Sequence, residues 1–266
     1  MQKKLFNQFT AFGITDVGCV REQNEDNILI DEKLGLLIVA DGMGGHHAGE
    51  IASIEAIRVI QKIIQMHHRS QENQSLLSHL LQKIRPKPPE IKEKQAILLL
   101  ALDEANNHVY HLNLEMDHSS GRGMGTTIAG CWLISKNTLL VFHIGDSRIY
   151  RFKKQKLEGL SKDHSVLQEW HDNGCKGEKP KANVINKAVG PYSRVIPAIQ
   201  TVKINKTDGF LLCSDGLTDM ISDLDIKKAL QGIKSKKIES YSEKLVKLAK
   251  KQGGKDNISV ILMTQN

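Results

Sequence analysis

Three short apolar runs in this sequence each end beside an aspartate. The runs are residues 36–40 before Asp41-Gly42, residues 210–214 before Asp215-Gly216, and residues 139–145 before Asp146. Such runs are typical of buried strands, and a carboxylate at the rim of a core is costly unless it is paired or binds a metal. One such aspartate is typical of a turn or a helix cap. Three of them, from distant parts of the chain, indicate acidic ligands that converge on a hard cation.

Two further acidic clusters extend this candidate ligand set. Glu25 and Asp26 precede the short apolar run 28–30, and Asp256 precedes the run 258–262. Carboxylate and carbonyl oxygens are the preferred ligands of magnesium and manganese, whereas zinc favours histidine and cysteine. Gly42 is a further candidate, because a residue without Cβ lets its backbone carbonyl approach a metal closely. The pattern therefore predicts a site with oxygen ligands only.

Hydrolysis at phosphorus is the chemistry that this set suits. Two cations bridged by one carboxylate generate a hydroxide nucleophile near neutral pH and neutralise phosphoryl oxygens. Arg21 lies four and five residues before Glu25 and Asp26, and its guanidinium fork can hold two phosphate oxygens at once. Taken alone, Arg21 is typical of a solvated surface charge. Next to the acidic cluster it becomes the candidate phosphate clamp.

Six segments of the chain resemble the metal-dependent protein phosphatases, the type 2C serine/threonine family, and specifically its short bacterial single-domain members. The segments are residues 18–27, 39–46, 124–127, 143–148, 212–217 and 254–258. They occur in the family's order over nearly the whole chain, which makes the resemblance specific. It implies an α+β fold, a four-layer αββα sandwich in which helix pairs flank two antiparallel sheets and the metal site lies at one end.

The resemblance also implies a role for each candidate ligand, with manganese or magnesium as the cofactor. Asp41 would bridge two core metals. Asp215 and Asp256 would complete the first metal, and the Gly42 carbonyl the second. Glu25 and Asp26 would reach the second metal directly or through water, and Asp146 with Asp215 would hold a third. Arg21 would bind the substrate phosphate, while Asn257 and Ser147 would orient ligands.

The expected activity is hydrolysis of phosphoserine and phosphothreonine in proteins by a metal-activated hydroxide at a two-metal centre. The expected partners are phosphorylated proteins, with a partner serine/threonine kinase as a further candidate. The alternative is a catalytically weak member that binds phosphoproteins as a regulatory module. Such members typically lose metal carboxylates. Every aspartate of the pattern is present here, which favours the enzyme.

The chain departs from the family at two places. Animal members have histidine directly after the Asp-Gly pair, whereas this chain has Met43, as bacterial members do, and His46 is a candidate general acid. A metal-bound water is the alternative donor, and a purely structural role for His46 is a further alternative. Residues 162–191 are predicted to form a shortened flap, with a helix over 163–171 and a basic loop over 172–187. Loops around a rigid scaffold tune specificity, so the flap bears on substrate preference.

Composition predicts one cytoplasmic, monomeric domain over residues 1–266. The four cysteines form no disulfide framework, and Cys19 and Cys213 are interpreted as core residues. No run is long enough to span a membrane. The net charge of +7 invites a nucleic-acid interpretation, but the lysines are scattered and aromatic residues make up only 5% of the chain. Binding of nucleic acid or membrane is therefore not expected.

Helices are needed to cover the predicted sheets. The pattern predicts an amphipathic helix over 48–65, in which Ile51, Ile54, Ile57 or Arg58, and Gln61 give partial spacing for an inner face. A second helix over 90–116 has a core stripe of Ile97, Ala101, Ala105, Val109 and Leu112. Residues 67–89 are predicted to connect them, with a short helix around 75–84. Shorter helices are predicted over 223–230 and 238–251.

Overall fold

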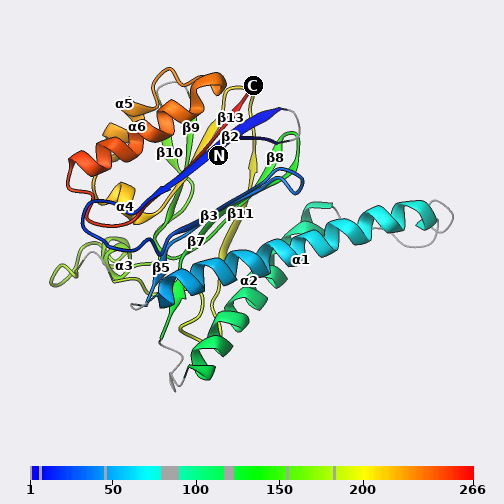
Figure 1. Ribbon diagram of the computed structural model, residues 1–266, viewed down its shortest axis with the longest axis horizontal. Coiled ribbons are helices and arrows are strands. Elements are labelled where there is room, and N and C mark those ends of the chain that lie inside the picture. The colour runs from blue at the N-terminus through cyan, green and yellow to red at the C-terminus, as the bar shows by residue number, and fades with distance from the viewer. Residues whose placement is uncertain are drawn as a thin grey trace.

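The computed structural model is a sandwich of two antiparallel sheets between two layers of helices (Figure 1), which confirms the predicted fold class. It describes residues 2–5, 8–44, 47–78, 90–116, 123–153, 156–181 and 184–266. One sheet, here sheet A, has the spatial order β1 (Gln2–Leu5), β2 (Phe9–Asp16), β13 (Ile258–Gln265), β12 (Gly209–Cys213), β9 (Arg148–Lys153) and β10 (Lys156–Gly159). The other, sheet B, has the order β11 (Ala198–Lys203), β8 (Thr138–Ile144), β7 (Ile128–Ser135), β4 (Leu36–Ala40) and β3 (Asn27–Asp31). Two short strands, β5 (Gly42–Met43) and β6 (Gly125–Thr126), pair with each other beyond sheet B.

A pair of long helices covers sheet B, and a pair of shorter ones covers sheet A. The helices over sheet B are α1 (Ala48–Ser78) and α2 (Glu90–Glu115). Those over sheet A are α5 (Asp223–Ala229) and α6 (Ile238–Lys251), which are joined through the 3₁₀ turn η1 (Ser235–Lys237). Two short helices, α3 (Val166–Asp172) and α4 (Asp215–Thr218), lie near the predicted site end (Figure 1). The helices predicted over 90–116, 223–230 and 238–251 are thus confirmed to within one residue.

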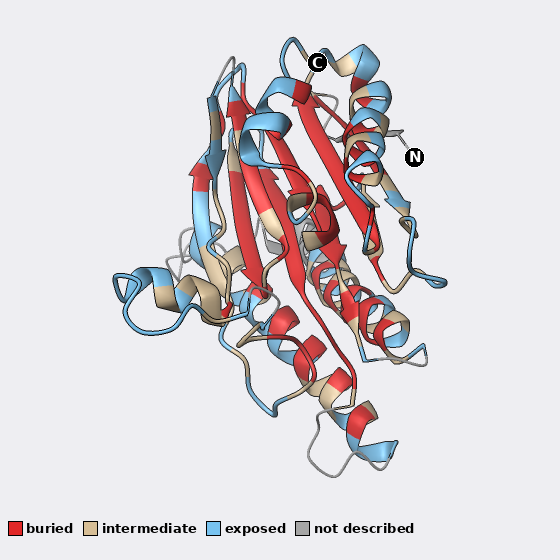
Figure 2. Ribbon diagram, turned by 90° about the vertical axis from the view of Figure 1, so that its left-hand side faces the viewer, coloured by how far each residue is buried: buried red, intermediate tan, exposed pale blue. Residues whose placement is uncertain are grey.

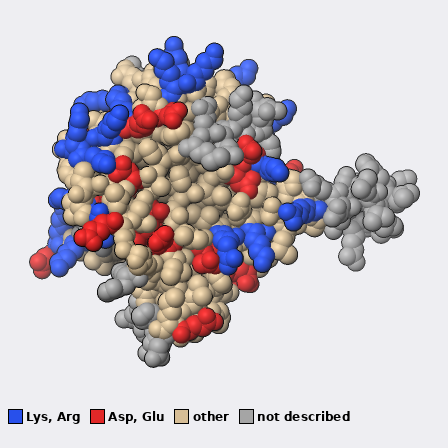
Figure 3. Space-filling view, viewed as in Figure 1, with Lys and Arg blue, Asp and Glu red and all other residues tan. Residues whose placement is uncertain are grey.

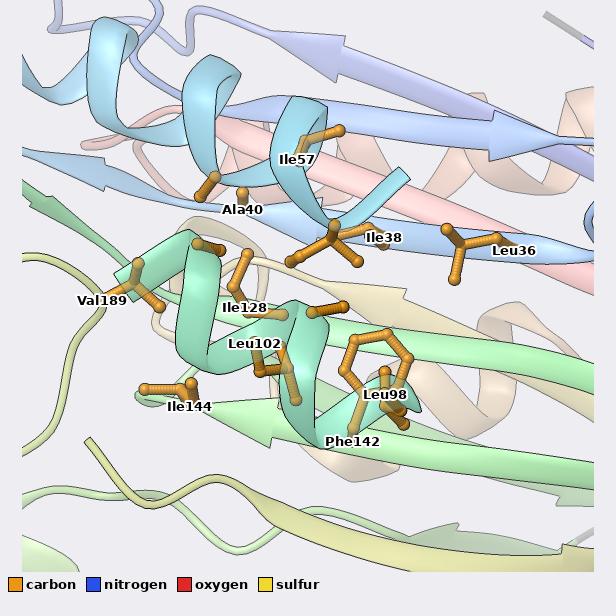
Figure 4. Close-up of a cluster of buried hydrophobic side chains, with 14 of the residues drawn as sticks. Leu36, Ile38, Ala40, Ile57, Leu98, Leu102, Ile128, Phe142, Ile144 and Val189 are labelled. Atoms are coloured by element: carbon orange, nitrogen blue, oxygen red, sulfur yellow. The ribbon is translucent and has the colours of Figure 1, made fainter. Parts of the chain in front are cut away.

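Strand β4 shows why the apolar runs form strands buried on both faces. Leu36 and Ile38 point toward α1 and α2, whereas Leu37 and Val39 point toward sheet A, because successive side chains of a strand alternate between its faces. Figure 4 shows Leu36, Ile38 and residues of α1 and α2 in the first of these layers. Both faces of the sheet are covered by other elements, so the strand has no polar side. Figure 2 shows the same burial along the central strands of both sheets.

The predicted inner face of the first helix is only partly confirmed, because Ile57 is buried but other predicted positions are not. Ile51 and Ile54 are exposed, and the helix instead buries Ala52, Ala56, Ile60 and Ile64, which are spaced four residues apart. The spacing of the large aliphatic residues misleads here because two of the buried positions on α1, Ala52 and Ala56, are alanines, which carry a weak apolar signal. The predicted face of α2 is confirmed: Ala101, Ala105 and Val109 are buried, and Ile97 and Leu112 pack at the edge of the same cluster.

Helix α1 is also longer than predicted. It continues through residues 67–78, where the sequence predicts a connection, so that prediction is wrong. Residues 75–78 of the predicted short helix belong to α1, and residues 79–84 lie outside the described part of the chain. Figure 1 shows α1 extending past the edge of sheet B. The propensity of the polar residues here is compatible with helix, and α2 packs along α1, so the helix does not need a continuous apolar stripe to continue.

The predicted flap contains one short helix, α3, which begins at Val166, three residues after the predicted start. The Ser165 hydroxyl caps it by accepting a hydrogen bond from the Gln168 N–H at 3.2 Å. The Val166 N–H donates to the Val184 carbonyl at 2.9 Å, which ties the two ends of the segment together. The flap therefore has an ordered base next to the predicted site.

Two further sequence predictions can be compared with the structure. Cys213 is buried in β12 as predicted, but Cys19 is exposed. Strand β2 ends at Asp16, so Cys19 lies in the turn that follows and not in the core. None of the helices in the described ranges is sufficiently long and apolar to cross a membrane.

Candidate metal centre

All six predicted acidic ligands lie at one end of the sandwich, where strands end or begin. Asp41 follows β4, Asp146 follows β8 and Asp215 follows β12, while Asp256 precedes β13 and Asp26 precedes β3. Antiparallel pairing of β12 with β13 brings the end of one to the start of the other. The carboxylates are close enough to interact electrostatically: Asp41 with Asp26, Asp215 and Asp146, and Asp215 with Asp256.

The backbone of Asp41 is anchored by two threonines. Its N–H donates to the Thr127 hydroxyl at 3.1 Å, and its carbonyl accepts from the Thr127 N–H and the Thr126 hydroxyl, both at 2.9 Å. The Thr127 hydroxyl in turn lies 2.6 Å from the Ser147 hydroxyl. These contacts fix the main chain at Asp41 and leave its carboxylate to face the other acidic groups. Sequence reasoning missed Thr126 and Thr127, although they lie in one of the segments that carry the family resemblance.

Gly42 packs against the first turn of α1 and against Glu25. A Cβ at Gly42 would lie 2.2 Å from the Gly49 carbonyl oxygen and 2.5 Å from that of Glu25, distances at which atoms overlap. Gly49 has the reciprocal requirement, since a Cβ there would lie 2.7 Å from the Gly42 carbonyl carbon. The pair of glycines lets three chain segments meet behind the site. Gly49 was not identified from the sequence, because nothing in its local pattern shows this contact.

Glu25 and Asp26 are positioned by residues from the far end of the sequence. The Glu25 N–H donates to the Asn257 side-chain oxygen at 2.9 Å, and its carboxylate accepts from the Gly49 N–H at 3.3 Å. The buried carboxylate of Asp26 accepts from the Ser214 hydroxyl at 2.8 Å. Asn257 also donates to the Gln23 carbonyl at 2.8 Å. The segment with Glu25 and Asp26 is thereby held against the end of β12 and the start of β13.

Several carboxylates of the cluster are buried close to one another, and this raises their pKa values. Burial, and to a lesser extent the nearby Asp215 and Asp256, raise the pKa of Asp26 to about 7. Burial, and then the Asp215 carboxylate, raise the pKa of Asp146 to about 7. The pKa of Asp41 is raised by burial and by its acidic neighbours, and that of Asp215 is raised to about 6, chiefly by burial. Like charges held together in this way resist ionisation unless cations join them.

This donor set fits hard divalent cations. It offers carboxylate and carbonyl oxygens, whose shared negative charge such ions would neutralise. Within the described ranges, no three acidic, histidine or cysteine side chains are already arranged to hold a metal ion. Three of the carboxylates are instead held by the protein: Asp26 by Ser214, Glu25 by Gly49 and Asp256 by Arg21. Ligation would exchange those hydrogen bonds for metal contacts.

Arg21 lies at the rim of the cluster and contacts one of the predicted ligands. Its Nη2 donates to the Asp256 carboxylate at 2.8 Å, and about half of the Arg21 side chain is exposed. The sequence does not predict this ion pair, because the two residues are 235 positions apart. The guanidinium has five N–H donors, so one bond to Asp256 leaves others for a phosphate.

The candidate proton donor His46 lies outside the described residues. Its neighbour His47 is exposed, with a positive φ of 67°, and its Nε2 lies 3.0 Å from the Gln23 side-chain nitrogen. Met43 lies in β5 and pairs with Gly125. The role of His46 as general acid therefore stays a prediction from the sequence.

Comparisons with known proteins give a consistent result. The family model described as "Protein phosphatase 2C" matches residues 20–263. The chain is 33% identical over 261 residues to the serine/threonine phosphatase stp of Listeria welshimeri, covering 95% of this chain and 94% of that protein. It is 33% identical over 256 residues to the serine/threonine protein phosphatase PstP of Mycobacterium tuberculosis, covering 93% of this chain and 43% of that longer protein.

Solved structures agree with the sequence matches. The crystal structure of the catalytic domain of PstP in complex with two manganese ions has a TM-score of 0.77 at 30% identity, covering 97% of this chain and 98% of that one. The Streptococcus agalactiae serine/threonine phosphatase has a TM-score of 0.79 at 29% identity, covering 97% and 100%.

Proposed function

The chain belongs to the protein phosphatase 2C family and is a metal-dependent serine/threonine protein phosphatase, and we propose that the acidic cluster at the end of the sandwich is its catalytic centre. The observation that carries this proposal is the convergence of three carboxylates from distant segments, Asp26, Asp146 and Asp215, on Asp41, with pKa values raised by burial and by one another. A protein tolerates that arrangement where cations compensate it. We propose that Asp41 bridges two core ions, with Asp215, Asp256, Gly42, Glu25 and Asp26 as the other ligands, and that Asp146 and Asp215 hold a third.

The bound cations would lower the pKa of a coordinated water and neutralise phosphoryl oxygens. The chain's own residues have three tasks. Thr126 and Thr127 keep the Asp41 backbone fixed, so that its carboxylate does not reorient as charge develops. Asn257 holds the Glu25 backbone in place. Arg21 orients the phosphate from the rim through the donors that Asp256 does not occupy.

The remaining step is the donation of a proton to the departing serine or threonine oxygen. His46 is our candidate donor, and a comparison of leaving groups tests it. An aryl phosphate releases a phenolate, which can depart without protonation, whereas a phosphothreonine peptide would release a far more basic alkoxide, which needs a proton. His46→Gln should therefore slow the peptide reaction more than the aryl reaction. Equal effects on both substrates would remove His46 from this role.

The substrates are phosphoproteins, because the family acts on phosphoserine and phosphothreonine in proteins. We further propose that one catalytic domain covers residues 1–266, that residues 162–191 form its flap, and that the protein acts as a monomer in the cytoplasm without nucleic acid or membrane as partners. A serine/threonine kinase that phosphorylates the same substrates is the expected opposing enzyme. Manganese is the favoured ion, because a related catalytic domain was crystallised with it, and magnesium is the alternative.

Metal add-back tests the proposed centre. After exhaustive dialysis against chelator, turnover of a phosphothreonine peptide should be undetectable and should return with manganese or magnesium. The Asp41→Asn variant should not recover at any metal concentration, and the exposed α2 residue Asp103 provides a matched control, Asp103→Asn, that should recover fully. A wild-type protein that binds phosphopeptide but turns over none with either metal would favour the regulatory-module alternative.

A further inference from the structure

A cavity of about 420 Å³ lies at the end of sheet A opposite the acidic cluster. It is bounded by the start of β12, the end of β13 and the turn between α5 and η1, and its lining includes Phe152, Asp208, Gly209, Ile233, Lys234 and Thr264. Figure 1 shows the end of β13, marked C, and the α5–α6 connection on the side of the molecule away from β5 and α4. Strand β12 runs from this cavity to Asp215, and its five residues span roughly 17 Å. The cavity is therefore separate from the catalytic centre.

Asp208 and Thr264, which line the cavity, each have one buried side-chain atom without a hydrogen-bond partner among the described residues: Oδ1 of Asp208 and Oγ1 of Thr264. Asp208 is 2% exposed and Thr264 is 7% exposed. Buried polar atoms in native proteins are nearly always hydrogen-bonded, so two orphans lining one cavity call for a common explanation. Thr264 lies on the same face of β13 as the buried Leu262, which packs toward α5 and α6. Its hydroxyl thus belongs to the helix side of sheet A, where the cavity opens.

The local turn uses only one oxygen of Asp208. Oδ2 accepts from the Asn205 N–H at 2.9 Å and from the Asn205 side-chain amide at 3.2 Å. Oδ1 has only the Lys153 ammonium at 3.7 Å, an ion-pair distance that is too long for a hydrogen bond. Arg151 lies 3.9 Å from Oδ2. The two cations compensate the buried charge, and Oδ1 still lacks a donor.

The other residues that line the cavity indicate what kind of ligand would fit it. Lys206 and Lys234 line the cavity and are largely exposed at its rim, and Phe152, Leu230 and Ile233 provide an apolar wall. Figure 3 shows lysine and arginine side chains gathered over the helices that cover sheet A. A ligand for this cavity needs a hydroxyl or amine for Asp208, an anionic group for the lysines and a compact body between them. The anion must lie apart from the hydroxyl, because Asp208 would repel it.

We propose that this cavity binds a phosphorylated sugar, either as a free sugar phosphate or as the ribose phosphate of a nucleotide. A sugar hydroxyl donates to Asp208 Oδ1, a second hydroxyl pairs with Thr264 Oγ1, and the phosphate lies toward Lys206 and Lys234. The apolar wall packs against the ring of the sugar or the base. The volume matches that of small-molecule sites. This inference does not depend on the proposed catalytic centre.

Calorimetry in the presence of chelator, which silences turnover, tests the proposal with four probes: ribose 5-phosphate, AMP, ribose and inorganic phosphate. We expect ribose 5-phosphate or AMP to bind at least tenfold more tightly than ribose or inorganic phosphate. Tighter binding of AMP would identify a nucleotide site, and equal or tighter binding of ribose 5-phosphate would identify a sugar-phosphate site. In amide NMR spectra, the bound probe should shift Gly209 and Ile233 and leave the segment around Asp41 unchanged.

Two variants separate recognition from folding. Thr264→Val keeps the shape and removes the orphan hydroxyl, so the protein should remain folded while probe affinity falls about fivefold, the effect of one hydrogen bond. Asp208→Asn keeps an oxygen for the Asn205 turn and places an amide donor where Oδ1 accepts, so affinity should fall further. Lys234→Ala should weaken binding, whereas Lys236→Ala, a neighbouring lysine that does not line the cavity, should not.

Three results would overturn the proposal. One is the absence of binding tighter than about 10 mM for both phosphorylated probes. Another is binding of ribose or inorganic phosphate as tight as that of ribose 5-phosphate. The third is unchanged affinity in a folded Thr264→Val protein together with amide shifts at the acidic cluster.

Discussion

The space between the two sheets and the end of the sandwich are built from the same strands in opposite ways. Between the sheets, Leu37, Val39, Phe210 and Leu212 are fully buried among other apolar side chains. A few residues further along the same strands, Asp41 and Asp215 lie among other carboxylates, and burial followed by the repulsion of these neighbours raises their pKa values. The apolar side chains between the sheets stabilise the fold, whereas the carboxylates at the end of the sandwich lower its stability and serve function. Substitutions in the two regions should therefore have opposite signatures.

The largest effect is expected from removing the central carboxylate. Asp41→Asn should lower turnover of a phosphopeptide by at least about 10²–10³-fold, because preorganised charge of this kind typically contributes that much. The metal-free variant should nonetheless unfold at a higher temperature than the metal-free wild type, because one repelling charge is gone. Steady-state kinetics measures the loss of turnover, and thermal unfolding in chelator measures the change in the unfolding temperature. Normal turnover at saturating metal would remove Asp41 from the centre.

The converse signature is expected between the sheets. Phe210→Ala should lower the free energy of unfolding by about 3–5 kcal/mol, from lost burial and the cavity left behind. Denaturant unfolding measures the loss, and metal affinity of the folded fraction should match that of the wild type. The exposed Ile196 provides the control, since Ile196→Ala should change stability by less than about 0.5 kcal/mol. A small loss for Phe210→Ala would mean that the interior tolerates cavities.

The rim of the site should show a third, intermediate signature. Arg21→Ala should lower kcat/KM by about 10- to 100-fold, the effect of losing charged hydrogen bonds to the phosphate. Metal affinity, measured by calorimetry, should change little, because removing the Asp256 ion pair frees that carboxylate for a metal. Arg21→Lys should restore activity only in part, since an ammonium lacks the planar fork. Loss of core metal binding in Arg21→Ala would assign the guanidinium a structural role instead.

A smaller effect on turnover is expected from the threonines that hydrogen-bond the backbone of Asp41. Thr127→Val removes the hydroxyl that accepts from the Asp41 N–H and contacts Ser147. Turnover should fall about threefold to tenfold, in line with the loss of one or two neutral hydrogen bonds of ~1 kcal/mol each. Thr126→Val removes the hydroxyl's bonds to the Asp41 and Thr127 carbonyls but leaves the bond of the Asp41 N–H intact, so it should have the milder effect. If both variants match the wild type, the strand ends alone hold Asp41 in place.

The smallest expected effect concerns pH. His143 and His164 stack with ring centroids 4.6 Å apart, and the His164 Nδ1 accepts from the Gly145 N–H at 3.2 Å. Burial, and then the neighbouring imidazole, lower the pKa of His164 to about 4, and burial lowers that of His143. Both are below the unfolded value of about 6.5, so their contribution is complete above pH 6.5 and is lost as the pH falls toward 4.

Urea unfolding at pH 7.5 and pH 5 measures this contribution. The wild type should lose about 1 kcal/mol more than His164→Asn between the two pH values, after discounting for partial exposure. Asparagine keeps an acceptor for the Gly145 N–H and does not titrate. The exposed His171 is the control, because His171→Asn should follow the wild type. Parallel pH dependence in all three proteins would contradict the assignment.

The sequence predicts the two regions unequally. Strands buried on both faces appear as apolar runs, so β4, β8 and β12 and the acidic residues after them are all recognisable. What escapes prediction is contact between distant residues: Arg21 with Asp256, Asp41 with Thr127, and Gly42 with Gly49. The two residues of each pair are either far apart in the sequence or belong to no local sequence pattern that would indicate the contact. Part of the inner face of α1 was misjudged because two of its buried positions, Ala52 and Ala56, are alanines, which have no strong apolar signature.

The place of β13 in sheet A has a consequence for how the protein is made. This strand lies between β2 and β12, yet it follows every other described strand along the chain. A ribosome delivers the chain from its N-terminal end at about 5–20 residues per second. Until Gln265 has emerged, β2 and β12 have no partner between them, and Asp256 and Asn257 have no strand to hold them beside Asp215. A growing chain therefore lacks the complete proposed metal centre, and we expect phosphatase activity only once synthesis has passed this last strand.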